Sequence, residues 1–156
     1  MIRLARILYA TDFSEHSLCA LPYAKSFAEE YKAELHCLHV VDEAYQYWLG
    51  LSGEGLPVGP APDEMVRMAE AQMKEFADRH LADCTVPLVR KVVLGRPFVE
   101  IVRYAREAGM DLIVLATHGR GALRHVLLGG TAEKVVRKAF CPVLTIRSPE
   151  HEFVMP

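Results

Sequence analysis

Short apolar runs alternate with amphipathic segments along most of the chain. Runs rich in Ile, Leu and Val, bounded by turn residues, predict five strands at 2–10, 33–41, 86–94, 111–116 and 142–146. Between them, apolar side chains recur at helical spacing and predict helices at 14–31, 63–82, 97–108 and from about 131 to 139. Strands that alternate with helices predict an α/β fold, a three-layer open parallel sheet with helices on both faces.

Capping residues set the expected limits of these helices. Ser14 is a favourable N-cap for the first helix, and Pro22 is tolerated there if it lies in the early turns. Asp63 is expected to cap the second helix. Pro97 suits the first turn of the third helix, and Gly109 is expected to close it.

Two stretches lack this periodicity. Residues 42–63 are rich in Gly and Pro in their second half and predict a long surface loop, which would serve as a lid, a contact surface or a disordered insert. The polar end of the chain predicts a flexible tail at 149–156. With 156 residues, the chain is expected to form one domain over 1–148.

Composition narrows the class of protein. Apolar residues make up 51% and charged residues 24% of the chain, and the net charge is -2, which gives no global argument for nucleic acid or an anionic membrane as a partner. No apolar run approaches the roughly 18 residues of a membrane span, and the first residues do not resemble a signal peptide, so we expect a cytoplasmic protein. The four scattered cysteines are expected to be small core residues.

The segment from Leu115 to Thr131 is the best candidate for ligand binding. It contains Gly119, Gly121, Gly129 and Gly130 and joins a predicted buried strand to a predicted helix. Glycine-rich backbone in this setting brings N–H groups close to an anion, and the helix dipole favours negative charge. The sequence therefore predicts a phosphate-binding loop.

Three segments together resemble the universal stress protein family. They are Ile-Leu-Tyr-Ala-Thr-Asp-Phe-Ser at 7–14, Asp-Leu-Ile-Val-Leu-Ala-Thr-His-Gly-Arg at 111–120 and Cys-Pro-Val-Leu-Thr-Ile-Arg at 141–147. The resemblance implies a five-stranded parallel sheet in the order 3-2-1-4-5. In that order the topological switch lies between strands one and four, where ligands of open α/β sheets bind. The exit of strand one, Thr11-Asp12, should then face the glycine loop.

The ATP-binding branch of this family carries Gly, two residues, Gly, nine residues, Gly, and then Ser or Thr. Gly119 and Gly129 keep the nine-residue spacing, but Ala116 stands at the first glycine and Gly130 at the hydroxyl position, with Thr131 one residue later. Loss of one charge-assisted hydrogen bond to phosphate would cost about 1.5–3 kcal/mol. The resemblance therefore implies a weakened or altered site for ATP or a related adenine nucleotide.

The resemblance also assigns roles to other residues. Asp12 would hold ribose hydroxyls or a phosphate-bound Mg²⁺, although a turn aspartate is the alternative. Val41 would pack against adenine, although a core valine is the alternative. The full set of candidate binding residues is Thr11, Asp12, Val41, Leu115, Ala116, His118, Gly119, Arg120, Gly129, Gly130 and Thr131.

Strand five is expected at the edge of the sheet, and an exposed apolar edge needs cover. The resemblance implies a homodimer in which Val143, Leu144 and Ile146 lie at the interface. With no legible catalytic set, the leading hypothesis is a stress-response protein that binds an adenine nucleotide and has a regulatory output. A dimeric interaction module without nucleotide is the alternative, and an enzyme of a related α/β fold is a third hypothesis that would need a further substrate domain.

Overall fold

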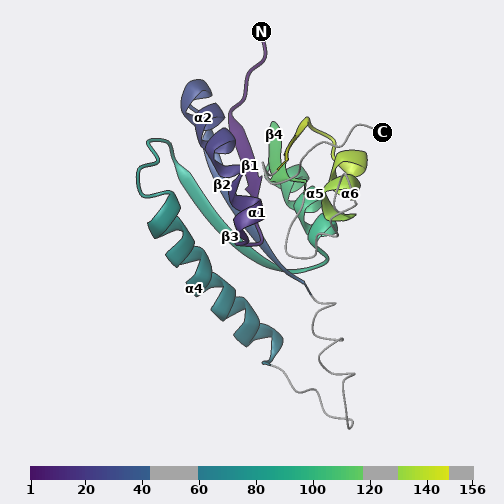
Figure 1. Cartoon of the computed structure of the whole chain (residues 1–156). Coiled ribbons are helices and arrows are strands. Elements are labelled where there is room, and N and C mark those ends of the chain that lie inside the picture. Colours follow the sequence, from purple (N-terminus) through teal and green to yellow (C-terminus); the bar gives the residue numbers. More distant parts are fainter. Residues whose placement is uncertain (43–59, 118–129, 148–156) are drawn as a thin grey trace, which may run out of the picture.

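The computed structural model describes residues 1–42, 60–117 and 130–147. Five parallel strands form one sheet in the order β3-β2-β1-β4-β5, which confirms the fold class and strand order (Figure 1). The strands are β1 (Arg6–Ala10), β2 (Glu34–Asp42), β3 (Leu88–Gly95), β4 (Leu112–Ala116) and β5 (Val143–Ile146).

The described helices cover both faces of the sheet. They are α1 (Glu15–Leu18), α2 (Leu21–Tyr31), α4 (Pro62–His80), α5 (Pro97–Glu107) and α6 (Gly130–Lys138). Helices α2 and α4 pack on one face, and α5 and α6 pack on the other (Figure 1). Of the loop predicted at 42–63, residues 43–59 lie outside the described residues, as does the tail at 149–156. At its two ends the prediction is wrong, because Asp42 ends β2 and Pro62 begins α4.

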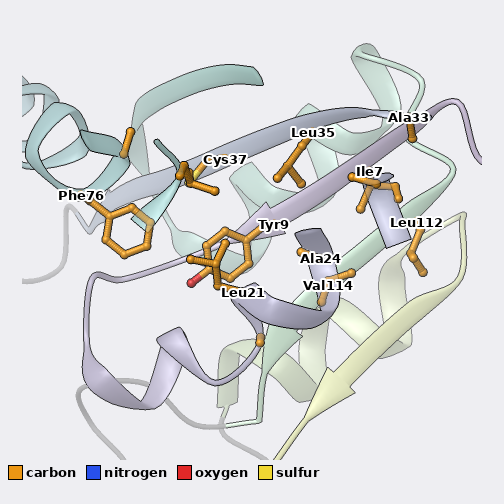
Figure 2. Packing of buried hydrophobic residues seen from close by; sticks show 14 of the residues in the cluster. Ile7, Tyr9, Leu21, Ala24, Ala33, Leu35, Cys37, Phe76, Leu112 and Val114 are labelled. Atoms are coloured by element: carbon orange, nitrogen blue, oxygen red, sulfur yellow. The ribbon is translucent and has the colours of Figure 1, made fainter. Parts of the chain in front are cut away.

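Alternation along the strands divides the core between the two faces. Ile7 and Tyr9 of β1 belong to the cluster under α2 and α4, whereas Leu8 and Ala10 belong to the cluster under α5 and α6. Figure 2 shows the first cluster, in which the ring of Tyr9 stacks against that of Phe76 with centroids 6.4 Å apart. Both faces of the sheet are therefore buried, as the nearly continuous apolar strands predicted.

The prediction of one helix over 14–31 is wrong. Two helices form instead, α1 and α2, with Cys19 and Ala20 between them. Pro22 lies in the first turn of α2, because its ring would clash with the carbonyl of the residue four places earlier in a continuous helix. Ser14 is the N-cap of α1, as predicted, and its hydroxyl accepts a hydrogen bond from Ser17 N.

Two smaller predictions also need correction. The N-cap of α4 is Ala61 and not Asp63, because Pro62 takes the first helical position, where a missing N–H costs nothing. Asp63 lies in the first turn, where the helix dipole favours its charge. Of the four cysteines, only Cys37 is buried, and the other three are partly exposed. Gly109 does follow α5 with a φ of +64°, as a residue that closes a helix should.

Candidate functional site at the carboxyl edge of the sheet

A local network of hydrogen bonds holds the turn after β1 in place. The Oγ1 atom of Thr11 accepts from Phe13 N at 3.0 Å, and Asp12 Oδ1 accepts from Ser14 N at 3.0 Å. The hydroxyls of Thr11 and Ser17 lie 2.8 Å apart, and both residues are buried. These bonds confirm Asp12 as a turn residue and fix its place at the strand exit, whereas its role with a ligand stays a prediction.

Tyr9 anchors this turn from below. Its hydroxyl donates to the carbonyl oxygen of Ser17 at 3.0 Å, within the buried interior. Burial raises the pKa of the Tyr9 phenol because the charged form would lose its solvation. The turn therefore rests on a neutral hydrogen-bonded hydroxyl and does not rest on an ion pair.

The exit of β4 lies level with the exit of β1. Tyr9 pairs with Val114 in the parallel register, so Thr11 and Ala116, each two residues further, reach the same height. Leu115 is buried and faces α5 and α6, whereas Ala116 is partly exposed and packs toward the other face. The sheet thus brings Thr11, Asp12 and Ala116 to one edge, as the strand order predicted.

The end of the predicted glycine loop is visible at the start of α6. Gly130 is the first residue of this helix, and Thr131 follows it on an exposed turn. A Cβ added to Gly130 would meet no atom within 4 Å. His118, Gly119, Arg120 and Gly129 lie outside the described residues, so their placement stays a prediction.

The end of β2 adds a residue that sequence reasoning missed. Leu35 N donates to Pro87 O, so the main-chain groups of odd-numbered residues in β2 face β3. Those of Val41 therefore face β3, and its side chain is buried with 6% exposure, as the core-valine alternative expected. The main chain of Val40 points the opposite way, so its N–H and C=O groups face the side of β1. The sequence indicates only that alternate residues of a strand turn their main-chain groups to opposite neighbours. Which neighbour Val40 faces could be decided only once the strand register was known.

Phe13, which follows β1, is in ring contact with His39 of β2 at the exits of the two strands. The rings of Phe13 and His39 stack with centroids 4.2 Å apart and an interplanar angle of 24°. The Nδ1 atom of His39 lies 2.8 Å from the carbonyl oxygen of Thr11, so Nδ1 carries the hydrogen and donates. Phe13 has a φ of +62°, a left-handed conformation that non-glycine residues rarely adopt.

The described residues contain no group of three or more His, Cys, Asp or Glu side chains that would hold a metal ion. Within the described part of the chain, no helix is long and apolar enough to cross a membrane.

An open parallel sheet whose order switches between β1 and β4, with helices on both faces, defines the class of doubly wound α/β domains. The family model of the universal stress protein family matches residues 4–147, and the chain belongs to this family. It is similar to universal stress protein MJ0577 of Methanocaldococcus jannaschii, with 32% identity over 91% of this chain and 94% of the relative. It is also similar to universal stress protein YxiE of Bacillus subtilis, with 33% identity over 91% of this chain and 98% of the relative.

Solved structures agree with this assignment. The structure of MJ0577 superposes with a TM-score of 0.79 at 30% identity and covers 96% of this chain and 99% of that chain. Two more distant structures hold ligands. One is a universal stress protein in complex with cAMP, with a TM-score of 0.66 and 22% identity over 94% of this chain and 98% of that chain. The other is an Archaeoglobus fulgidus protein with dAMP, with a TM-score of 0.63 and 20% identity over 93% of this chain and 98% of that chain. At these identities the two complexes establish a shared fold.

Proposed function

We propose that this chain binds an adenine nucleotide, with ATP as the first candidate, at the carboxyl edge of the sheet between β1 and β4. The observation that carries the proposal is the level placement of the two strand exits, with Asp12 fixed in a turn at that edge. Two relatives with the same fold hold cAMP and dAMP, which supports adenine nucleotides as the ligand class.

The described residues fit such a ligand. Val40 turns main-chain donor and acceptor groups toward the crevice side of β2, where the edge of a base would pair with them. Gly130 begins a nine-residue helix whose first N–H groups favour a negative charge, and the space around its Cα is open. His118, Gly119, Arg120 and Gly129 would complete the phosphate contacts. When bound, the nucleotide would supply a signal that depends on its phosphates.

We expect the output to be regulatory and not catalytic, through a homodimer that pairs along β5. In the described residues, β5 pairs with β4 on one side only, and its four residues are all partly exposed. Pro142 O accepts from Ile113 N in β4, and Ile146 O accepts from Thr117 N directly after β4. The main-chain groups of the even-numbered residues therefore face β4, and those of Thr145 face outward. Val143, Leu144 and Ile146 would add apolar contact.

Calorimetric titration tests the nucleotide directly. The purified protein is titrated with ATP, AMP and GTP, each with and without Mg²⁺, at concentrations up to the millimolar range. We expect heat with ATP or AMP and a weaker response to GTP. No heat and no thermal shift with any of the three would refute the proposal, and rapid turnover of bound ATP would replace it with an enzymatic one.

A pair of charge-matched variants then locates the site. Asp12→Asn keeps an Oδ1 atom for the hydrogen bond from Ser14 N but removes the negative charge, so the turn should survive while Mg²⁺-dependent affinity falls at least tenfold. Glu15→Gln removes the same charge from an exposed neighbour and should bind as the unmodified protein does. Equal affinity of all three proteins would mean that the ligand lies elsewhere.

A proline at position 145 tests the dimer, because the main-chain N–H of Thr145 faces away from β4. Thr145→Pro removes an outward N–H and leaves the bonds to β4 in place, so it should give monomers in sedimentation analysis with little loss of secondary structure. Leu144→Pro is the control, because it breaks the ladder to β4 and should destabilise the fold itself. A Thr145→Pro protein that stays dimeric would contradict pairing through β5.

The alternative function is a dimeric interaction module that binds no nucleotide. Ala116 and Gly130 favour it, because they stand where the ATP-binding pattern has glycine and a hydroxyl. The alternative predicts the same response to Thr145→Pro but no heat with any nucleotide, so the two experiments together separate it from the leading proposal.

A further inference from the structure

The hydrogen-bond ladder between β1 and β2 stops one rung earlier than its register allows. Glu34 N donates to Ala5 O and Thr11 N donates to Leu38 O, and this spacing would next pair Val40 N with Thr11 O. Among the backbone hydrogen bonds of the described residues that rung is missing. The His39 ring is there instead, with its Nδ1 atom 2.8 Å from the Thr11 carbonyl oxygen.

The His39 side chain thus bonds to the Thr11 carbonyl oxygen, which is the acceptor that the Val40 amide would use in a continued ladder. Phe13 stacks on the same imidazole with ring centroids 4.2 Å apart, and its own backbone is left-handed, with a φ of +62°. Phe13 N is tied back to Thr11 Oγ1, so the chain bends immediately after the captured carbonyl. The two rings are therefore in contact at the ends of β1 and β2, where the rung is missing and where the proposed nucleotide would bind.

We propose that His39, with Phe13 stacked on it, is a positioning residue of the nucleotide site. It acts through Thr11 by keeping the Thr11 carbonyl away from the Val40 amide, so that this amide stays directed into the crevice. The inference rests on the proposed function. Neither ring needs to touch the ligand.

The proposal requires that the donor on His39 matters more than the size of its ring. His39→Leu keeps apolar bulk but cannot donate, so β1 and β2 should close by one rung and bury the Val40 N–H in the ladder. His39→Asn retains an N–H at the δ position, the same number of bonds from Cα as Nδ1, and should still hold the Thr11 carbonyl. The two variants separate the hydrogen bond from packing.

A histidine on the same strand supplies the control. His36 is buried on the opposite face of β2, where its ring nitrogens lie 2.8 Å from Tyr104 Oη and 2.6 Å from Glu34 Oε1. His36→Leu removes two ring hydrogen bonds from the core and should lower thermal stability at least as much as His39→Leu. Its affinity for nucleotide should stay unchanged because it lies on the other face.

The experiment combines calorimetry with residue-resolved amide exchange. For the unmodified protein we expect fast exchange at the Val40 amide and slower exchange when AMP is added. His39→Leu should show a protected Val40 amide without ligand and at least tenfold weaker AMP binding, whereas His39→Asn should stay within about threefold of the unmodified protein.

The outcomes distinguish this inference from the function on which it rests. If the unmodified protein binds no adenine nucleotide, the proposed function fails and this inference fails with it. If the unmodified protein binds AMP but His39→Leu binds equally well, or loses no more affinity than His36→Leu, only the positioning role is overturned. A Val40 amide that is already protected without ligand in the unmodified protein would also overturn it.

Discussion

Among the glycines that the structure describes, Gly95 is the one at which an added methyl group should cost the most stability. It ends β3 with a φ of +152°, and a Cβ built there would lie 2.7 Å from Glu100 Cγ and 2.8 Å from Glu100 Oε1. Glu100 is buried and paired with Arg103, so its carboxyl group has little room to move. Gly95→Ala therefore strains the backbone and displaces a buried charged group at once.

The expected cost is the sum of these two effects. A residue forced into a conformation that only glycine adopts readily costs about 1–3 kcal/mol, and overpacking against a buried neighbour costs about 1–3 kcal/mol. We expect Gly95→Ala to lower the free energy of unfolding by roughly 2–6 kcal/mol. With a urea m-value of about 2 kcal/mol/M, the middle of the usual range, the unfolding midpoint should fall by roughly 1–3 M.

Urea unfolding followed by circular dichroism, at one fixed protein concentration, measures this cost. Gly130→Ala is the matched control, because its Cβ meets nothing within 4 Å and a helical glycine costs about 0.5–1 kcal/mol relative to alanine, so its midpoint should stay or rise. Glu100→Ala should reduce the cost of Gly95→Ala by removing the overlap. An unchanged midpoint for Gly95→Ala, or a cost that Glu100→Ala does not alter, would refute this reasoning.

Two further predictions concern the ligand and pH. Gly130→Ser should bind ATP roughly tenfold to a hundredfold more tightly than Gly130→Ala, because a hydroxyl beside phosphate contributes about 1.5–3 kcal/mol; equal affinities by calorimetry would place this position away from phosphate. Burial raises the pKa of the Cys37 thiol to about 12, so the folded state keeps its proton while the unfolded chain releases it near the ordinary value of 9.0. The contribution of this thiol to the free energy of unfolding should therefore be fully present below about pH 9. Between about pH 9 and 12 the free energy of unfolding should fall by up to about 1.4 kcal/mol per pH unit. Cys37→Ala should flatten this slope in urea unfolding across that range, and an identical slope would show that the thiol is not its source.

The sheet was predictable because its strands carry a strong apolar pattern. The strands β1, β2 and β4 are buried on both faces, so continuous runs such as Leu112–Ala116 mark their positions to within a few residues. Strand order was a different matter. Periodicity does not determine which strands pair, and the order came from the resemblance of three short segments to a known family.

The errors fall where two local signals competed. Apolar spacing continues through Pro22, but the proline ring broke the helix that this spacing predicted. Asp63 is a good cap in isolation, but Pro62 beside it fits the first helical position better. In both places the backbone geometry of proline outweighed side-chain pattern.

The candidate site was predicted in part. Thr11 and Asp12 were expected at this edge because they directly follow strand one, and the register brings them level with Ala116, whereas their role with a ligand stays a prediction. The direction of the Val40 main chain and the contact of His39 with the Thr11 carbonyl depend on register and rotamer. Neither property follows from the spacing of residues, so neither could be predicted from the sequence alone.

The break between α1 and α2 has a consequence for how this family can diverge. Residues 11–18 satisfy many of their hydrogen bonds with one another, through pairs such as Thr11 with Ser17 and Asp12 with Ser14. Helix α2 starts afresh beyond the break and builds the core with Leu21, Ala24 and Ala28. Substitutions at the partly exposed positions of the turn after β1 therefore need not disturb the helix that supports the core, and this segment can vary in sequence at a lower cost to the fold than a continuous helix over 14–31 would allow.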